Sequence, residues 1–133
     1  MNLRNFVARA TVVVTAGAIF SLFGGPAQAS SGWDYIGVTE FPRNSSDYIR
    51  TTGNALSTGG DLEACITTAS TKSHAYDLWE YDPNNADDFV DAVNGSGCWI
   101  FRDIGKYVDG DNNRAEFYIG TYDDDALRVY WYD

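Results

Sequence analysis

Three carboxylates surround one turn near the middle of the chain. Glu80 and Asp82 end an apolar and aromatic run that starts at Leu78, and Asp88 follows a turn at residues 83–87. Alternate residues of a strand point to the same side, so Glu80 and Asp82 can face one ion, with Asp88 brought back across it. Calcium takes about six to eight oxygen ligands at ~2.4 Å, from carboxylates and carbonyls on a flexible loop. This stretch therefore predicts a calcium site formed by Glu80, Asp82 and Asp88.

Residues 78–90 resemble the third calcium-binding loop of C2 domains. In that family an acidic-x-acidic pair at a strand end is followed, at the same offset, by Asp and an aromatic-aliphatic pair. The matching residues are Trp79-Glu80-Tyr81-Asp82 and Asp87-Asp88-Phe89-Val90. Glu80 stands where that family usually has Asp, Asp91 stands where it usually has Gly, and the earlier acidic loop is not evident upstream. The resemblance implies a β-sandwich with an acidic loop more than it implies lipid binding.

The same stretch also fits a short helix over residues 86–94. Asn85 would be its N-cap, the Asp87 and Asp88 carboxylates would lie in the first turn near the positive end of the macrodipole, and Gly95 would follow its end. Its buried stripe would consist of Ala86, Phe89, Val90 and Val93. This alternative explains the carboxylates without a metal.

Aromatic residues give a second indication of binding. The chain has 9 Tyr, 7 Phe and 4 Trp. Four tyrosines alternate with apolar residues near the C-terminus and are predicted to form one exposed ladder: Tyr118, Tyr122, Tyr130 and Tyr132. Exposed tyrosines stack on sugar rings or form hot spots of protein interfaces. In a two-layer sandwich, tyrosines can instead cover a sheet partly, with their hydroxyls outward.

Catalytic residue patterns are not evident. His74 is the only histidine, and no nucleophile signature surrounds it, so a histidine in a surface turn is expected. A zinc site needs several His or Cys ligands, which the chain does not offer beyond one cysteine pair. These observations predict a protein that is not an enzyme.

The N-terminal segment, residues 1–29, is predicted to be a signal peptide. Arg4 and Arg9 form a positive region, and an apolar stretch with small residues follows over residues 10–23. Ala27-Gln28-Ala29 then fits the small-x-small cleavage rule. The apolar stretch is short of the ~20 residues of a membrane span and is interrupted by polar residues and glycines. A secreted, extracellular protein is expected.

The mature chain would run from Ser30 to Asp133 as one β-rich domain. The whole chain has 9 basic and 19 acidic residues, a formal net charge of −10. Losing Arg4 and Arg9 would leave a charge of −12. Such a charge repels phosphate backbones and anionic membranes. We therefore expect no binding to nucleic acid, and binding to membranes is disfavoured. The charge suits a cationic partner, metal ions or simple solubility.

The cysteine count predicts one disulfide. Cys65 and Cys98 are the only cysteines, and an export signal would place them in an oxidising compartment. With two cysteines the pairing is forced once both are oxidised. In the chain-entropy model this loop contributes on the order of 3–4 kcal/mol.

Hydrophobic alternation in the C-terminal third predicts an antiparallel meander with one buried face. The meander is expected to start with the apolar run at residues 98–101, followed after a turn at 109–113 by two alternating strands that a solvated Asp-rich turn at 123–125 separates. The turn at residues 109–113 begins Asp109-x-Asp111, like an EF-hand loop, but lacks the later Gly and Glu of that motif. The expected buried residues are Ala115, Phe117, Ile119, Thr121, Leu127, Val129 and Trp131.

Strands also account best for most of the remaining chain. Residues 33–38 and 47–51 have aromatic and β-branched character, and residues 62–69 favour a strand through their threonines although their apolar spacing also fits a helix. The predicted fold is mainly β: a small antiparallel β-sandwich or curved sheet with a C-terminal meander and one disulfide, with one short helix near 86–94 as the alternative.

Two function hypotheses follow from these features. The first is a secreted, calcium-stabilised binding module that recognises a carbohydrate or protein ligand through exposed aromatics beside an acidic loop. The second is a secreted acidic inhibitor that docks on a cationic enzyme or toxin.

Overall fold

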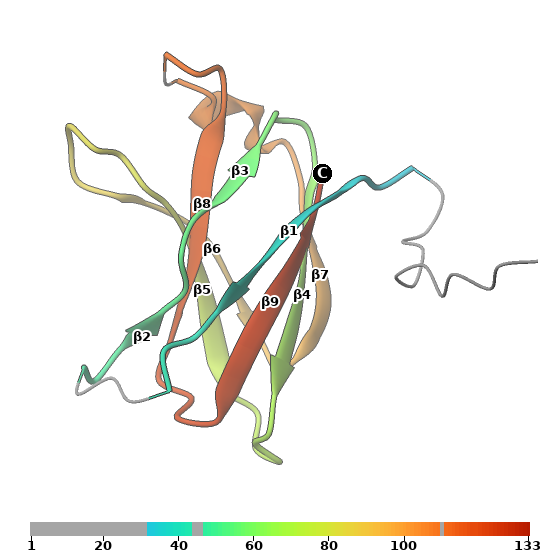
Figure 1. The fold of residues 1–133 in the computed structure, drawn as a ribbon, viewed down its shortest axis with the longest axis vertical. Helices are drawn as coiled ribbons and strands as arrows, with labels where there is room; N and C mark the ends of the chain where they lie inside the picture. The colour runs from blue at the N-terminus through green and yellow to red at the C-terminus, as the bar shows by residue number, and fades with distance from the viewer. Residues whose placement is uncertain (1–31, 44–46, 110) are drawn as a thin grey trace, which may run out of the picture.

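The structure is a β-sandwich of two antiparallel sheets packed face to face (Figure 1). This computed structural model describes residues 32–43, 47–109 and 111–133. The predicted signal peptide, its cleavage site and Ser30 lie outside the described residues. In the described part of the chain the expected mainly β fold is confirmed.

The two sheets divide the strands as follows. The first sheet has the order β1 (Tyr35–Glu40), β9 (Ala126–Tyr132), β4 (Leu62–Thr68) and β7 (Gly97–Phe101). The second has the order β2 (Arg50–Thr51), β8 (Ala115–Thr121), β5 (Ala75–Glu80) and β6 (Asp88–Asn94), and β3 (Ala55–Ser57) also pairs with β8. A short 3-10 helix, η1 (Ile104–Tyr107), follows β7. None of the helices in the described residues is long and apolar enough to cross a membrane.

Alternating side chains from both sheets fill the space between them. Successive residues of a strand point to opposite faces, so every second residue enters the core. The buried residues at these positions are Leu62, Ala64, Ile66, Tyr76, Leu78, Phe117, Ile119, Val129 and Trp131. The prediction that residues 62–69 favour a strand is confirmed, because Leu62–Thr68 is strand β4 and includes two of the threonines.

The predicted C-terminal meander is wrong. Strands β7 and β9 belong to the first sheet, whereas β8 lies in the second, so the chain crosses between the sheets before and after β8 (Figure 1). The alternating sequences of β8 and β9 predict two neighbouring strands that share one apolar face. Two strands on opposite sides of a sandwich bury their apolar faces against each other equally well, so the pattern does not distinguish the two arrangements.

Leu127 is also misplaced by the prediction. It is 36% exposed, and Ala126, which is 2% exposed, takes the inward position instead. The register of β9 against β4 shifts at this point: Arg128 lies opposite Thr67, but Ala126 lies opposite Thr68. Leu127 is therefore the extra residue of a β-bulge, which inverts the alternation on one side of it.

Residues 86–94 do not form the helix given as the alternative. Asp88–Asn94 is strand β6, which pairs with β5 in a hairpin whose turn holds residues 81–87. The β-branched Val90 and Val93 and the aromatic Phe89 suit the strand, and Val90 and Val93 are the two side chains of β6 that pack against the core. Pairing along β5 thus outweighs the local capping signals.

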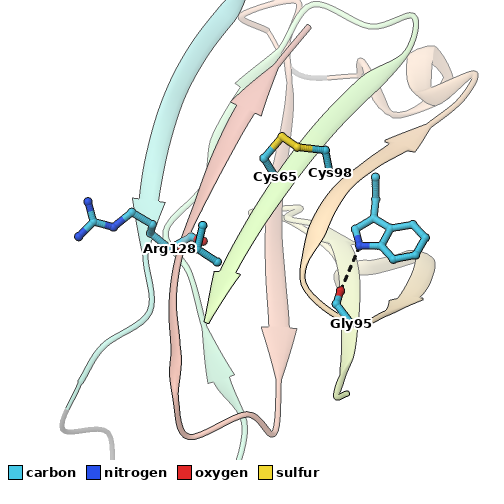
Figure 2. The surroundings of a disulfide bond; sticks show 6 residues. Cys65, Gly95, Cys98 and Arg128 are labelled. Carbon is cyan, nitrogen blue, oxygen red and sulfur yellow. Dashed lines mark hydrogen bonds between the residues drawn. A yellow bond between two sulfur atoms is a disulfide. The ribbon is translucent and has the colours of Figure 1, made fainter. Parts of the chain in front are cut away.

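The disulfide joins two neighbouring strands of the first sheet (Figure 2). Cys65 of β4 and Cys98 of β7 lie directly opposite each other in the register, and their sulfurs are bonded. The side chain of Cys65 points away from the core, because Ala64 and Ile66 on either side of it are buried. Beside the disulfide, the indole Nε1 of Trp99 donates to the Gly95 carbonyl at 3.1 Å. The predicted disulfide is confirmed, and it fixes the edge strand β7.

Candidate functional site: the aromatic face and acidic end of the second sheet

The outer face of the second sheet carries a row of three aromatic side chains. Trp79 of β5 is directly opposite Tyr118 of β8 on one side and Phe89 of β6 on the other. The Trp79 and Phe89 rings meet edge to face, with centroids 5.3 Å apart. Phe89 is 52% exposed, and Trp79 and Tyr118 are half-buried. The row therefore presents ring surface to solvent across three neighbouring strands.

A shallow groove of about 290 Å³ runs beside this row. Gly120 forms part of its lining, one row further along the sheet, between Thr51 on β2 and Asp77 on β5. A Cβ atom added to Gly120 would lie 3.7 Å from the Nε1 atom of Trp79 and 3.7 Å from Cγ2 of Ile49. The lack of a side chain at Gly120 thus keeps the indole N–H edge of Trp79 accessible from the groove.

Two carboxylates border the groove. Asp77 is half-buried, and its side chain makes no hydrogen bond or ion pair within the described part of the chain. Asp87 accepts a hydrogen bond of 2.7 Å from the Tyr118 hydroxyl and a longer one from the Asp82 amide. Burial, and then the nearby Asp87 carboxylate, raise the pKa of Tyr118 above its usual value, so this phenol stays protonated. Asp77 offers a free acceptor, whereas Asp87 fixes the orientation of the Tyr118 ring.

Two more aromatic residues extend the exposed surface past the groove. Tyr122 is 51% exposed and lines the groove, and its ring meets that of Tyr48 edge to face at 4.9 Å. Ile49, 47% exposed, follows Tyr48 in the chain, and its Cγ2 atom lies close to Gly120. Together with the row of three, these residues form what we call the aromatic face: Tyr48, Ile49, Trp79, Phe89, Tyr118 and Tyr122.

A cluster of carboxylates lies at one end of the same sheet. Glu80 ends β5 on its inward-facing side and is only 2% exposed. Its Oε1 atom is the one buried side-chain oxygen or nitrogen without a hydrogen-bond partner among the described residues. Burial, and then the negative charges of Asp109, Asp82 and neighbouring carboxylates, raise the pKa of Glu80 to about 7. This group is therefore partly protonated near neutral pH.

The turns at this end enclose a polar hollow of about 470 Å³. One wall comes from the β5–β6 turn and the other from the segment between η1 and β8, and Figure 1 shows both turns at the same end of the sandwich. The lining residues are Asp82, Pro83, Asn84, Asn85, Asp109, Asp111, Asn112 and Glu116. Oxygen-bearing side chains dominate this list, and no basic residue contributes to it.

A family match places this chain among known proteins. Residues 35–131 match the family described as the YndA coiled coil domain. The chain belongs to this family. It is similar to "Uncharacterized protein YndA" of Bacillus subtilis (strain 168), with 36% identity over 104 residues that cover 76% of this chain and 74% of the relative. No solved structure gives a significant match.

The fold of this YndA-family chain differs from what the family description suggests. In the residues that the structure describes, the only helical element is η1, with 4 residues, and all longer elements are strands. The matched region 35–131 spans nearly the whole sandwich, from β1 into β9. The conclusions about the site therefore rest on the sheets and not on the coiled-coil description.

The four predicted binding tyrosines do not share one surface of the YndA-family chain. Tyr118 and Tyr122 belong to the aromatic face of the second sheet. Tyr130 and Tyr132 belong to β9 in the first sheet, on the far side of the core, and Tyr132 packs edge to face on Tyr35 at 5.5 Å. The single ladder is wrong for the same reason as the meander. The structure supplies different neighbours for Tyr118, namely Trp79 and Phe89.

The three predicted calcium ligands do not converge in this structure. Among the described residues, the only set of three or more acidic, Cys or His side chains with ligand atoms within 4.8 Å of one another is Glu63 with the disulfide-bonded Cys65 and Cys98. Asp82 is occupied locally, because it accepts hydrogen bonds from the Asn84 and Asn85 amides and from the Asn85 side chain. These hydrogen bonds lower the pKa of Asp82, and the bond from the Asn84 amide has the largest effect.

A second buried carboxylate was missed by the sequence analysis. Asp123 was predicted to lie in a solvated turn, but it is 1% exposed and accepts hydrogen bonds of 2.6 Å from both the Tyr76 and Thr68 hydroxyls. The Asp125 amide donates to its other oxygen. Burial by itself would raise the pKa of Asp123, but these hydrogen bonds outweigh it and lower the pKa below its usual value. Every second residue of β8 faces the core, and this alternation continues past the end of the strand from Thr121 to Asp123.

The only histidine lies beside this network without forming a catalytic relay. His74 Nε2 is 3.2 Å from the Ser70 hydroxyl and 3.7 Å from an Asp123 oxygen. A Ser-His-Asp relay uses the two ring nitrogens separately, one for the hydroxyl and one for the acid. Here both groups approach the same nitrogen, so the arrangement is suited to holding the turn and not to activating a nucleophile.

Proposed function

We propose that this protein is a secreted, non-catalytic binding module that takes a carbohydrate chain on the aromatic face of its second sheet. The observation that carries the proposal is the row Tyr118–Trp79–Phe89 beside the unpartnered Asp77 carboxylate. Binding sites for small ligands combine apolar and aromatic lining with a few placed polar groups. Sugar rings match this combination, because their C–H faces stack on aromatic rings and their hydroxyls donate to carboxylates.

Gly120 lines the groove without a side chain of its own, and this supports a ligand that lies along the sheet. A sugar ring seated over Gly120 would contact the edge of Trp79 and reach Asp77, which is the next residue across in the register. The exposed rings of Phe89 and Tyr122 lie on either side of this position. The surface is open and elongated, which suits part of a polymer better than a single free sugar.

Secretion is supported by the predicted signal peptide over residues 1–29 and by the disulfide between Cys65 and Cys98. Expression of the full chain in an exporting bacterial host should release a protein whose first residue is Ser30. N-terminal sequencing of the protein from the culture medium is the measurement. Recovery of the uncleaved chain from the membrane or cytosol would contradict this part of the proposal.

The carbohydrate proposal predicts that Trp79→Ala weakens binding at least tenfold, because the stacking surface at the centre of the row is removed. The probes are a glycan array followed by equilibrium binding to the polysaccharide that gives the strongest signal. Asp77→Asn should weaken the same binding by a smaller factor, since it removes a charged acceptor but no ring.

The matched control is Tyr35→Ala. Tyr35 is also an exposed aromatic residue, 53% accessible, but it lies on the first sheet. Its removal should leave binding within about twofold of the unmodified protein, and urea unfolding of each variant separates lost binding from lost fold. Equal losses for Trp79→Ala and Tyr35→Ala would contradict the assignment. So would an absence of glycan binding together with salt-sensitive binding to basic proteins, which is the result expected of the acidic inhibitor.

A further inference from the structure

The carboxyl group of Glu80 is buried without the partners that such a group needs. Its side chain is 2% exposed, and Oε1 has no hydrogen-bond donor among the described residues. Burying an ionised carboxylate is costly unless it is paired with a positive charge and hydrogen-bonded. The ion pairs of the described residues join His74 to Asp123, Arg102 to Asp61 and Arg128 to Glu40, and none of them includes Glu80. No ion pair within the described residues therefore neutralises the Glu80 carboxylate.

Other carboxylates surround Glu80 instead of cations. Asp88 lies directly opposite Glu80 in the register of β5 and β6, so both side chains leave the sheet on the same side. Asp109, in the turn after η1, lines the polar hollow together with Glu116, whose backbone carbonyl accepts a hydrogen bond of 2.7 Å from the amide of Tyr81, the residue after Glu80. The side chains of Asp88 and Asp109 are exposed, and neither makes a hydrogen bond or ion pair within the described residues. Like charges placed opposite each other destabilise a sheet unless something compensates them.

Two further carboxylates nearby already accept hydrogen bonds from other groups. Asp82 accepts three hydrogen bonds from its own turn, and Glu116 accepts one from the Asn112 side chain at 2.7 Å. Unoccupied carboxylate oxygens at this end of the sandwich are thus found at the end of β5, at the start of β6 and in the turn after η1, where Asp111 offers a second one beside Asp109.

We propose that Glu80, Asp88 and Asp109 bind a calcium ion at this end of the sandwich. The unpartnered, buried oxygen of Glu80 is the innermost ligand, and the two exposed aspartates close over the ion from either side. Of the three ligands, Asp109 lines the polar hollow between the turns, and Asp111 and Asn112 in the same lining offer further side-chain oxygens. This site differs from the one predicted from residues 80–88 alone, because Asp109 replaces Asp82.

Calcium suits this site better than magnesium or zinc. Calcium accepts about six to eight oxygen ligands in flexible geometry, whereas magnesium requires near-ideal octahedral geometry and zinc prefers His and Cys. No three carboxylates here have oxygens within 4.8 Å of one another in the described residues, so the turns must move together when the ion binds. A site with this ordering cost should be weak, with a dissociation constant of ~0.1–1 mM, as in extracellular modules.

The test is calorimetric titration of the EDTA-treated, disulfide-intact protein with CaCl₂, with MgCl₂ as the comparison. One saturable site for calcium is expected, with a rise in the melting temperature at about 10 mM CaCl₂ because the ion binds only the folded state. Asp109→Asn should weaken calcium binding at least tenfold without lowering the melting temperature of the calcium-free protein. Asp109 is exposed, so this variant is expected to fold.

The matched control is Asp125→Asn, which removes one exposed carboxylate from the turn between β8 and β9, at the opposite end of the sandwich (Figure 1). It should bind calcium as the unmodified protein does. The proposal is overturned if no saturable calcium binding is found, or if Asp125→Asn weakens it as much as Asp109→Asn. Equal effects of magnesium and calcium would also overturn it, since they would indicate general screening of negative charge.

Discussion

Replacing Asp123 with alanine should lower the free energy of unfolding by about 3–5 kcal/mol. The change removes a buried charge, but it also leaves two buried hydroxyl donors, those of Tyr76 and Thr68, without their acceptor. Each unsatisfied buried donor costs on the order of 1–3 kcal/mol, and hydrogen bonds to a charged acceptor are stronger than neutral ones. Urea unfolding at neutral pH, with the disulfide intact, measures the loss.

The pH dependence identifies the carboxylate as the source of this stability. The pKa of Asp123 is lowered in the folded protein, so the unfolded chain takes up a proton first as the pH falls. The contribution is therefore complete above the unfolded pKa of about 3.9 and is lost as the pH falls through the folded pKa. The difference in the free energy of unfolding between the unmodified protein and Asp123→Ala should accordingly become smaller at acidic pH.

Asp124→Ala is the matched control for this prediction. Asp124 is the next residue of the same turn, but its side chain is exposed and its contact with Arg50 uses only its backbone carbonyl. The control should change stability by less than about 0.5 kcal/mol. An equal loss in both variants would mean that the charge of the turn, and not the buried network, sets the stability.

Replacing Glu80 with glutamine should have the opposite effect and stabilise the calcium-free protein at pH 8, by on the order of 2–3 kcal/mol. Glutamine has nearly the same shape but carries no charge to bury beside the neighbouring carboxylates. The measurement is urea unfolding in EDTA, so that metal binding does not contribute.

The sign follows from the raised pKa of Glu80, which is about 7 in the folded protein against 4.5 for a solvent-exposed glutamate. Below pH ~4.5 both states are protonated, and the two proteins should be equally stable. Between the two pKa values the unfolded chain ionises first, so the unmodified protein loses stability as the pH rises and the gap opens. Above pH 7 the gap should be constant. A gap that is the same at pH 4 and pH 8 would contradict a buried acid.

Glu40→Gln serves as the comparison for charge alone. Glu40 is exposed and lies 3.4 Å from Arg128 in a surface ion pair, which is worth at most about 1 kcal/mol. Its removal should be neutral or slightly destabilising at every pH. Stabilisation by Glu40→Gln equal to that by Glu80→Gln would show that the overall negative charge is responsible.

The two buried carboxylates illustrate how donors decide the role of a buried acid. Asp123 has two hydroxyls and an amide directed at its oxygens, so ionisation is favoured and the group stabilises the fold. Glu80 has an oxygen with no donor and other acids nearby, so ionisation is opposed. Unsatisfied groups of this kind are uncommon in folded proteins, and their presence is the physical reason to expect a ligand at that end of the sandwich.

Several features could be predicted from the sequence because they depend on local rules. Period-two alternation placed Phe117, Ile119, Val129 and Trp131 in the core, since the pleat of a strand alone sends alternate side chains to opposite faces. The pair Cys65–Cys98 followed from counting, because two cysteines allow one pairing. The fold class followed from the same alternation repeated along the chain.

The candidate sites could not be predicted in this way, because they depend on which strands are neighbours. The row Tyr118–Trp79–Phe89 combines β8, β5 and β6, which the sequence analysis did not place together, and the predicted ladder with Tyr130 and Tyr132 failed when β9 joined the other sheet. Alternation is set within one strand, whereas pairing and register are set by the combined burial of all strands. The sequence by itself thus determined the mainly β character, most of the inward positions of β8 and β9, and the disulfide. Only the tertiary structure decided which outward residues share a surface, and which of the 19 acidic residues are buried with donors or without them.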